Sequence, residues 1–310
     1  MDQTTSPAPN KLPLSPNSIG ALWMLGSAAG FLVMAVLAKG LGSTTSVAML
    51  IFWRSLAGVV AVLPFALMAG PQVWKTSRPG KLLLRSSYGT IGFFAGFYAL
   101  VHLPLAQSQA LSFSRTLFMT ILAVVILKEK VAWRRWTAVG IGFVGILMMT
   151  KPNFSAHATA LDPATIAALV SALAFAFALV TVKDLTKDHS SLTLVVYGNV
   201  FTTLAGLPFL ILDPVLPDLK TMGLLIAMGF AGVVAQSCYV RALSTGEASL
   251  MALIDYIRLP LVAIAGVIFF HEIPDTLAMV GAAIVIISTL YITLRDAQTK
   301  TAKPLAPPPA

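Results

Sequence analysis

Long apolar runs dominate the chain, and short polar segments separate them. Most contain the roughly 20 residues that a helix needs to cross the hydrocarbon core of a bilayer. Lipid offers the backbone no hydrogen-bond partner, so such runs must form helices or a closed barrel, and their lack of alternation excludes the barrel. The pattern predicts an all-α integral membrane protein with ten transmembrane helices, at residues 18–38, 45–69, 82–101, 105–127, 134–150, 164–182, 191–212, 221–243, 248–269 and 276–294.

Both ends of the chain are polar and rich in proline, and the segments 1–17 and 296–310 are predicted to be disordered tails. The first apolar run is long and follows a 17-residue tail. It also has a counterpart later in the chain, so we interpret it as a membrane span rather than a cleaved signal peptide.

The composition fits a membrane protein, with 57% hydrophobic and 11% charged residues, against about 25% charged in soluble domains. The formal net charge is +9, but the basic residues fall in short loops, which argues for membrane topology rather than nucleic-acid binding. With both termini in the cytoplasm, 15 Lys and Arg lie in inside segments and 3 in outside loops. We therefore expect a multi-pass protein of the cytoplasmic (inner) membrane with both termini cytoplasmic.

The chain matches itself when it is shifted by 143 or 144 residues. The segment "RTLFMTILAVVILKEK" (115–130) aligns with "RLPLVAIAGVIFFHEI" (258–273), which pairs Arg115 with Arg258 and Glu129 with Glu272. The match predicts two five-helix units, at 18–150 and 164–295. Because each unit has an odd number of spans, the second enters the membrane from the opposite side, as in carriers that open alternately to each face.

The stretch "HEIPDTLAMVGAA", with Glu272 and a glycine at 281, resembles the EamA repeat of the drug/metabolite transporter superfamily. In the first unit Ala138 stands where that glycine is expected. The resemblance implies a ten-helix bundle with a central cavity. It also implies a carrier that exports amino acids and other metabolites, or takes up compounds such as S-adenosylmethionine or riboflavin.

Four ionisable residues stand in the middle of apolar runs: Arg54, Arg115, Asp255 and Arg258. Each costs about 2.5–3.5 kcal/mol on insertion scales, so each needs a partner or a water-filled cavity. Asp255 and Arg258 are three residues apart and can form an ion pair along one helix. Arg115 has Ser112 in the equivalent place, so it has no local partner and is our first candidate for binding an anionic group of the cargo.

Other polar residues within the runs are weaker candidates for substrate binding, because an amide inside a membrane more often bonds a neighbouring helix. They are Gln109, Tyr256, Asn199, Gln236 and Tyr239. Glu129 and Glu272 are interpreted as structural residues at helix ends.

No P-loop, HExxH, GxSxG or metal-ligand pattern is present, so we expect neither an enzyme nor a cofactor. Asp255 is the single candidate for proton coupling, although the neighbouring Arg258 favours the ionised carboxylate. Facilitated exchange is the alternative.

These features predict a secondary carrier, more specifically an exporter, for a small anionic or zwitterionic, amino-acid-like metabolite. Uptake of S-adenosylmethionine, riboflavin or a similar metabolite is the alternative, and a hydrophobic-cation exporter or a membrane scaffold is more distant. The expected partners are the cargo and the lipid bilayer, and the chain is long enough to act as a monomer, with a dimer left open.

Overall fold

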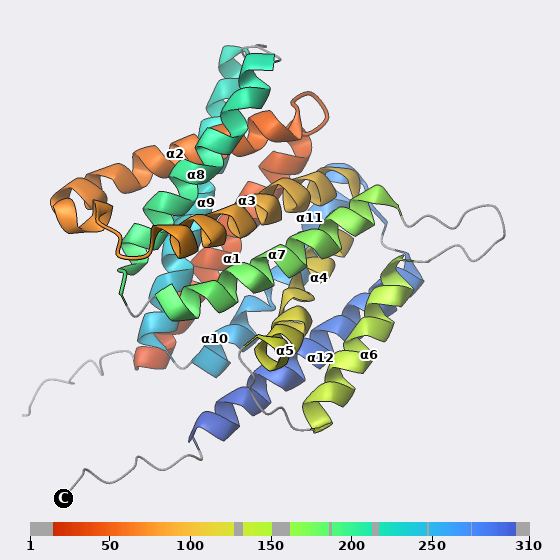
Figure 1. The fold of residues 1–310 in the computed structure, drawn as a ribbon. Coiled ribbons are helices and arrows are strands. Elements are labelled where there is room, and N and C mark those ends of the chain that lie inside the picture. Colours follow the sequence, from red (N-terminus) through yellow and green to blue (C-terminus); the bar gives the residue numbers. More distant parts are fainter. Residues whose placement is uncertain are drawn as a thin grey trace, which may run out of the picture.

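The computed structural model describes residues 15–126, 133–150, 162–185, 188–212, 217–246, 248–273 and 275–301. Every regular element in these ranges is a helix (Figure 1). The α-helices are α1 Pro16–Leu41, α2 Val47–Met68, α3 Pro79–His102, α4 Leu105–Phe113, α5 Arg115–Val125, α6 Trp133–Thr150, α7 Pro163–Leu185, α8 Ser191–Leu212, α9 Leu219–Thr245, α10 Ala248–Asp255, α11 Arg258–Phe270 and α12 Thr276–Thr301, and a 3₁₀ turn, η1, covers Pro71–Trp74.

Helix starts carry the residues that favour them. The Ser15 hydroxyl accepts a hydrogen bond from the Ser18 amide at 3.2 Å, and the Ser46 hydroxyl accepts one from the Met49 amide at 3.3 Å. The Asp218 carboxylate does the same for the Lys220 amide at 3.2 Å. These side chains satisfy amide groups that the first turn of a helix leaves without a partner.

Eight of the ten predicted spans are single helices, with ends close to those expected from the sequence. The expectation of ten continuous helices is wrong for the other two, since the run at 105–127 is divided into α4 and α5 and the run at 248–269 into α10 and α11. By length and hydropathy, five helices in the described ranges are candidate membrane spans: α1, α2, α7 over Pro163–Thr181, α8 over Leu192–Ile211, and α9.

The predicted tails overlap the first and last helices. Helix α1 begins at Pro16, and α12 continues to Thr301, past the predicted start of the C-terminal tail at residue 296. Residues 1–14 and 302–310, and Glu129, lie outside the described residues.

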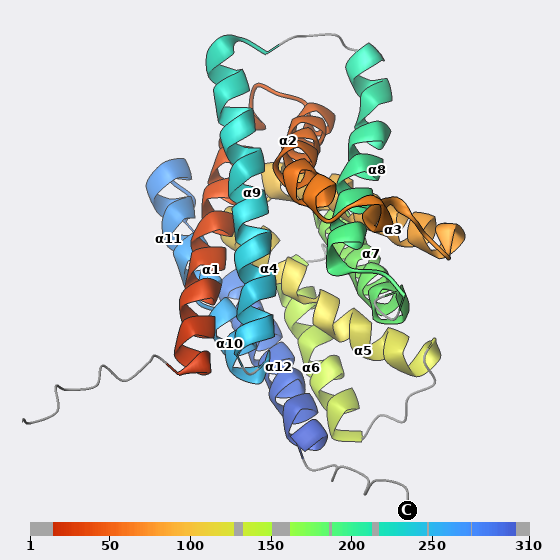
Figure 2. The same cartoon turned by 90° about the vertical axis from the view of Figure 1, so that its left-hand side faces the viewer.

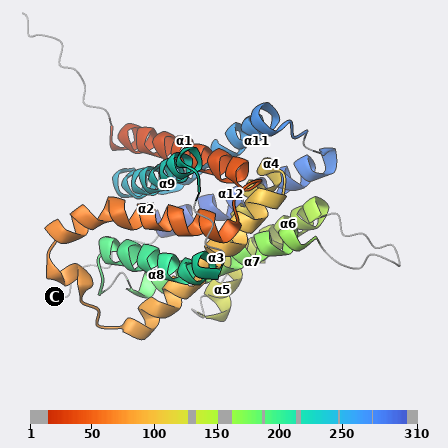
Figure 3. The ribbon, with the colours of Figure 1, turned by 90° about the horizontal axis from the view of Figure 1, so that it is seen from above.

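Helices from the first and second parts of the chain pack in pairs. Helix α1 lies along α9, α3 along α7, α6 along α12, and α2 along α8 (Figures 2 and 3). Helix α4 also packs against α11. The principal neighbour of most helices before residue 150 is therefore a helix that follows residue 162.

Small residues allow these pairs to approach closely. A Cβ built on Gly281 of α12 would lie 2.6 Å from the backbone oxygen of Gly145 on α6, and one built on Gly145 would lie 2.7 Å from the Gly281 oxygen. At the α3–α7 crossing, the Ser171 hydroxyl donates to the Gly92 carbonyl at 2.7 Å. The backbones at both crossings are thus nearly in contact.

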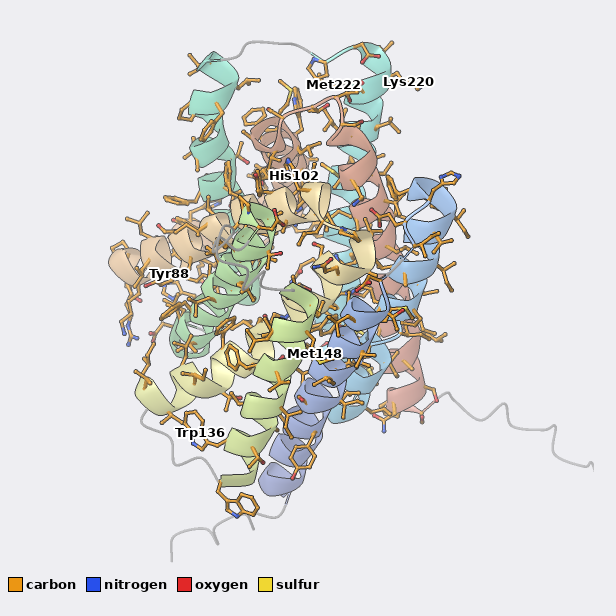
Figure 4. The ribbon with its side chains drawn as sticks, turned by 90° about the vertical axis from the view of Figure 1, so that its right-hand side faces the viewer. Tyr88, His102, Trp136, Met148, Lys220 and Met222 are labelled. Carbon is orange, nitrogen blue, oxygen red and sulfur yellow. The ribbon has the colours of Figure 1, made fainter. Side chains whose placement is uncertain are left out.

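The two ends of the bundle differ in their side chains. Figure 4 shows Lys220 and Met222 at one end and Trp136 at the opposite end. The described chain ends, at the start of α1 and the end of α12, lie toward the second of these (Figure 2).

One buried ion pair joins three segments of the fold. Lys39 Nζ lies 2.5 Å from Oε1 of Glu272, and both side chains are largely buried. Oε2 of Glu272 accepts a hydrogen bond from the Leu105 amide at 2.6 Å, and Lys39 also donates to the Leu103 carbonyl. The pair therefore connects the end of α1, the segment after α11 and the start of α4, which agrees with the structural interpretation of Glu272.

Candidate functional site

The two interrupted helices break at equivalent places in the chain. Helix α5 begins at Arg115 directly after the turn at Ser114, and α11 begins at Arg258 after the turn at Tyr256 and Ile257. In each turn an amide bonds a carbonyl three residues earlier, Ser114 to Leu111 and Ile257 to Ile254, both at 3.0 Å. Arg115 and Arg258 thus each occupy the first position of a half-helix.

The causes of the two breaks differ. Pro260 has no N–H to donate and its ring conflicts with the carbonyl four residues earlier, that of Tyr256, so the helix restarts just before it. In the first break the hydroxyls of Ser112 and Ser114 donate to the carbonyls of Gln109 and Leu111, each at 2.6 Å. Such local bonds compete with the helical hydrogen bonds and bend helices.

Asp255 and Arg258 form the predicted ion pair across the second break. Nη2 of Arg258 lies 3.7 Å from Oδ2 of Asp255, and both side chains are almost fully buried. Oδ1 of Asp255 and Nε of Arg258 have no hydrogen-bond partner within the described residues. Since buried polar atoms in folded proteins are rarely left unpaired, this pair has one acceptor and one donor available for a further group.

Aromatic rings connect the two breaks. Phe113 stacks on Tyr256 with 4.7 Å between ring centroids. The guanidinium carbons of Arg115 and Arg258 lie 5.8 and 5.2 Å from the centroid of Phe113. The Tyr256 hydroxyl donates to Thr289 of α12, which fixes the ring. Both arginines therefore lie beside the same aromatic side chain.

Helix α1 covers this cluster from another direction. The ring of Phe31 lies 4.9 Å from the Arg258 guanidinium carbon. One turn earlier on the same helix face, Ser27 is fully buried and its hydroxyl has no hydrogen-bond partner in the described ranges. The cluster is thus formed by α1 and by both broken spans.

Arg54 forms a second cationic position, on α2. Its guanidinium carbon lies 4.1 Å from the ring centroid of Phe93 and 5.8 Å from that of Phe97. Nε of Arg54 is buried without a hydrogen-bond partner, and no carboxylate of the described chain lies within 4 Å of the group. Contact with aromatic rings offsets only part of the free-energy cost of burying such a cation.

The positive charge exceeds the negative charge in this part of the bundle. Arg54, Arg115 and Arg258 supply three guanidinium groups, and Asp255 is the carboxylate paired with them among the described residues. In the same ranges, Arg115 has no carboxylate within 4 Å. The site therefore favours a ligand that brings negative charge.

The remaining predicted site residues lie in different places. The Ser112 hydroxyl is used by the Gln109 carbonyl. Tyr239 packs with Met24, Ala242 and Met251, and it is also close enough to Tyr256 and Arg258 to interact with them electrostatically. Asn199 donates to the Val195 carbonyl of its own helix at 3.0 Å and packs against Gly58.

Gln236 of α9 is exposed and lies one turn after Gly232, which faces Arg54. Sequence reasoning missed Phe31 and Phe113, whose neighbours along the chain give no sign that their rings face arginines.

No group of three or more His, Cys, Asp or Glu side chains with metal-binding geometry occurs in the described ranges. The chemistry available in the cluster is recognition of charge and of planar groups.

Comparison with known proteins identifies the family and a related fold. The model of the EamA-like transporter family matches residues 18–151 and again residues 163–294. A solved crystal structure has the same fold, with a TM-score of 0.60 and 16% identity over 89% of this chain and 98% of its own.

Similar sequences include three transporters of different cargo. The S-adenosylmethionine uptake transporter of Rickettsia bellii is 30% identical over 92% of this chain and 97% of its own length. The riboflavin transporter of Vibrio cholerae is 31% identical over 88% of this chain and 92% of its own length. The pseudopaline exporter CntI of Pseudomonas aeruginosa is 28% identical over 85% of this chain and 92% of its own length. Family and relatives together identify this chain as a multi-pass membrane transporter and not an enzyme: it belongs to the EamA-like transporter family.

Proposed function

We propose that this protein is a secondary carrier for a small anionic or zwitterionic, amino-acid-like metabolite. The observation that carries the proposal is the buried Asp255–Arg258 pair with one acceptor and one donor left over. An α-amino acid head has the complementary groups. Its carboxylate suits Nε of Arg258, and its ammonium suits Oδ1 of Asp255.

Arg115 adds a second guanidinium beside Phe113. A planar guanidinium binds a carboxylate through two parallel hydrogen bonds, so Arg115 can share the carboxylate of the cargo with Arg258. It also stands at the start of α5, where the partial positive charge of a helix N-terminus favours an anion.

Alternating access would follow from two inverted five-helix units in the membrane. Helix pairing supports this topology, because exchanging each span with its counterpart in the other half reproduces it. Helix α1 on α9 becomes α7 on α3, while α2 on α8 and α6 on α12 map onto themselves. Half-helices that meet at a central site are typical of carriers built in this way.

We place the protein in the cytoplasmic membrane with both termini inside, on the basis of the 15 to 3 distribution of basic residues. A reporter fused to the C-terminus tests this orientation. An alkaline phosphatase fusion should be inactive and a fluorescent protein fusion bright, and the reverse result contradicts it.

Uptake of S-adenosylmethionine is a second candidate, because relatives named for it match over nearly the whole chain. Its carboxylate fits Arg258 as well as that of any amino acid. Its additional sulfonium charge is unfavourable beside three guanidinium groups, which ranks it second. Relatives are named as uptake transporters and as an exporter, so export, our expectation from the sequence, needs direct measurement.

The test combines thermal-shift binding with transport in liposomes. Wild type, Arg115→Gln and Arg258→Gln are compared with the control Arg78→Gln, whose arginine pairs with Asp188 at 3.1 Å outside the cluster. The panel contains amino acids, S-adenosylmethionine, riboflavin and hydrophobic cations. A ligand at a hundredfold above its Kd should stabilise the protein by about 2.7 kcal/mol.

We expect amino acids or other carboxylates to stabilise wild type and the control but not Arg258→Gln. Loading liposomes from either side then gives the direction of transport. Stabilisation by cations in all four proteins contradicts the proposal.

A further inference from the structure

Arg54 is separate from the Asp255–Arg258 pair but faces the same region of the bundle. Phe31 of α1 lies over Arg258, and Met34 lies three residues further along that helix. A Cβ built on Gly232 would lie 3.0 Å from Sδ of Met34 and 3.5 Å from Nε of Arg54. Arg54 and Arg258 therefore both lie near the face of α1 that carries Phe31 and Met34.

Gly232 leaves space beside Arg54 because glycine has no side chain. Gly232 of α9 faces Nε and Nη2 of Arg54, at 3.5 and 3.7 Å from the position of a Cβ. Arg54 is half-buried while its Nε is fully buried and unpartnered in the described chain. Nε of Arg54 is thus an unused donor beside the rings of Phe93 and Phe97.

The balance of charge among Arg54, Arg115, Arg258 and Asp255 indicates which chemical group would occupy the space beside Arg54. A zwitterionic amino acid with one carboxylate has no net charge, so on the Asp255–Arg258 pair it leaves the excess of two positive charges unchanged. A cargo with a second acidic group reduces that excess and gives Arg54 the partner it lacks. Aromatic contact alone is weaker than a charge-assisted hydrogen bond.

We propose that Arg54 binds a second acidic group of the cargo, and that the preferred substrates are amino acids or related zwitterions with an additional carboxylate. This inference rests on the proposed function, since the amino acid head is placed on Asp255 and Arg258. It makes Arg54 the residue that selects among cargoes, while Arg258 is needed for all of them.

Acid and amide pairs of the same shape provide the test. Binding of aspartate and asparagine, glutamate and glutamine, and α-aminoadipate and its side-chain amide is measured by thermal shift. Three lengths are used so that one spans the distance between the two arginines. The proteins are wild type, Arg54→Gln, Arg54→Lys, Arg258→Gln and the control Arg78→Gln.

In at least one pair, the acid should bind wild type and the control about tenfold more tightly than the amide, or better, as expected for one charge-assisted hydrogen bond. Arg54→Gln should reduce the ratio to below about twofold by weakening the acid alone. Arg54→Lys keeps the positive charge and should retain part of the preference for the acid over the amide. Arg258→Gln should bind neither the acid nor the amide. The Lys variant keeps the test valid if the Gln variant does not fold.

An unchanged acid preference in Arg54→Gln overturns the inference, as does equal binding of acid and amide by wild type. If no member of any pair binds while another ligand binds in an Arg258-dependent way, the inference fails and the proposed function stands. If no ligand of the whole panel depends on Arg258, the proposed function itself fails.

Discussion

Lys39 and Glu272 contact each other across the fold, with 2.5 Å between Nζ and Oε1. Glu272 also accepts the Leu105 amide at the start of α4. One carboxylate therefore neutralises a buried cation and satisfies the first amide of a broken span.

We expect Glu272→Gln to lower the stability of the folded protein by about 3–5 kcal/mol, because it leaves the Lys39 charge buried without a counter-charge. Lys39→Met should cost a similar amount, and the double variant should cost less than the sum of the two. Denaturation in detergent measures all three. Additive losses would mean that the two residues act independently.

Gly281→Ala should destabilise the protein, since its Cβ would lie 2.6 Å from the Gly145 carbonyl oxygen and 3.0 Å from the Met149 amide nitrogen. Overpacking of this kind costs about 1–3 kcal/mol. Gly140→Ala on α6 is the matched control, because nothing lies within 4 Å of its Cβ position. Equal melting temperatures for the two variants would contradict the close α6–α12 contact.

Removing the hydroxyl of Tyr256 tests how firmly the second break is held. Its bond to Thr289 connects the break to α12, and Thr289 in turn donates to the Val285 carbonyl at 2.9 Å. Tyr256→Phe should cost about 0.5–1.5 kcal/mol of stability, with little change in binding of amino acids. A large loss of binding with unchanged stability would instead place the hydroxyl in contact with the cargo.

Arg115→Gln should weaken binding of carboxylates by roughly tenfold or more, the size of one charge-assisted hydrogen bond. Arg78→Gln should have no effect on binding, because Arg78 pairs with Asp188 at 3.1 Å outside the cluster. Isothermal titration of both variants decides the point. Loss of binding in Arg78→Gln would require a different site from the one described.

Transport in liposomes should proceed as exchange without a requirement for a pH gradient. The guanidinium of Arg258 lies 3.7 Å from Asp255 and already supplies its counter-charge, so the pair is neutral without an added proton. Counterflow with and without an imposed gradient tests this expectation. Accumulation driven by the gradient in wild type and absent in Asp255→Asn would make Asp255 the proton-coupling residue.

Sequence patterns were sufficient for most helix positions and for the Asp255–Arg258 pair. Apolar length determines where a span lies, and a three-residue spacing determines which side chains meet along one helix. The break at residues 256–257 had a signal in Pro260. The break at Ser114 had none, since serines that bond their own helix also occur in helices that remain continuous.

Contacts between helices could not be read from the sequence. Phe31 and Phe113 lie beside Arg258 because α1 and α4 pack on α11. The sequence likewise does not show that Gly232 of α9 lies against Met34 and Arg54, or that Gln236, one turn later on the same helix face, is exposed. Which face of a helix turns inward depends on its neighbours.

Helix pairing also has a consequence for how the protein is made. Helices α1, α3 and α6 leave the ribosome before their main neighbours α9, α7 and α12 have been synthesised. Arg54 and Arg115 likewise enter the membrane long before Asp255. The first half of the chain must therefore remain in the bilayer without its main neighbours until the second half arrives, and a nascent chain halted near residue 150 would leave those helix faces uncovered.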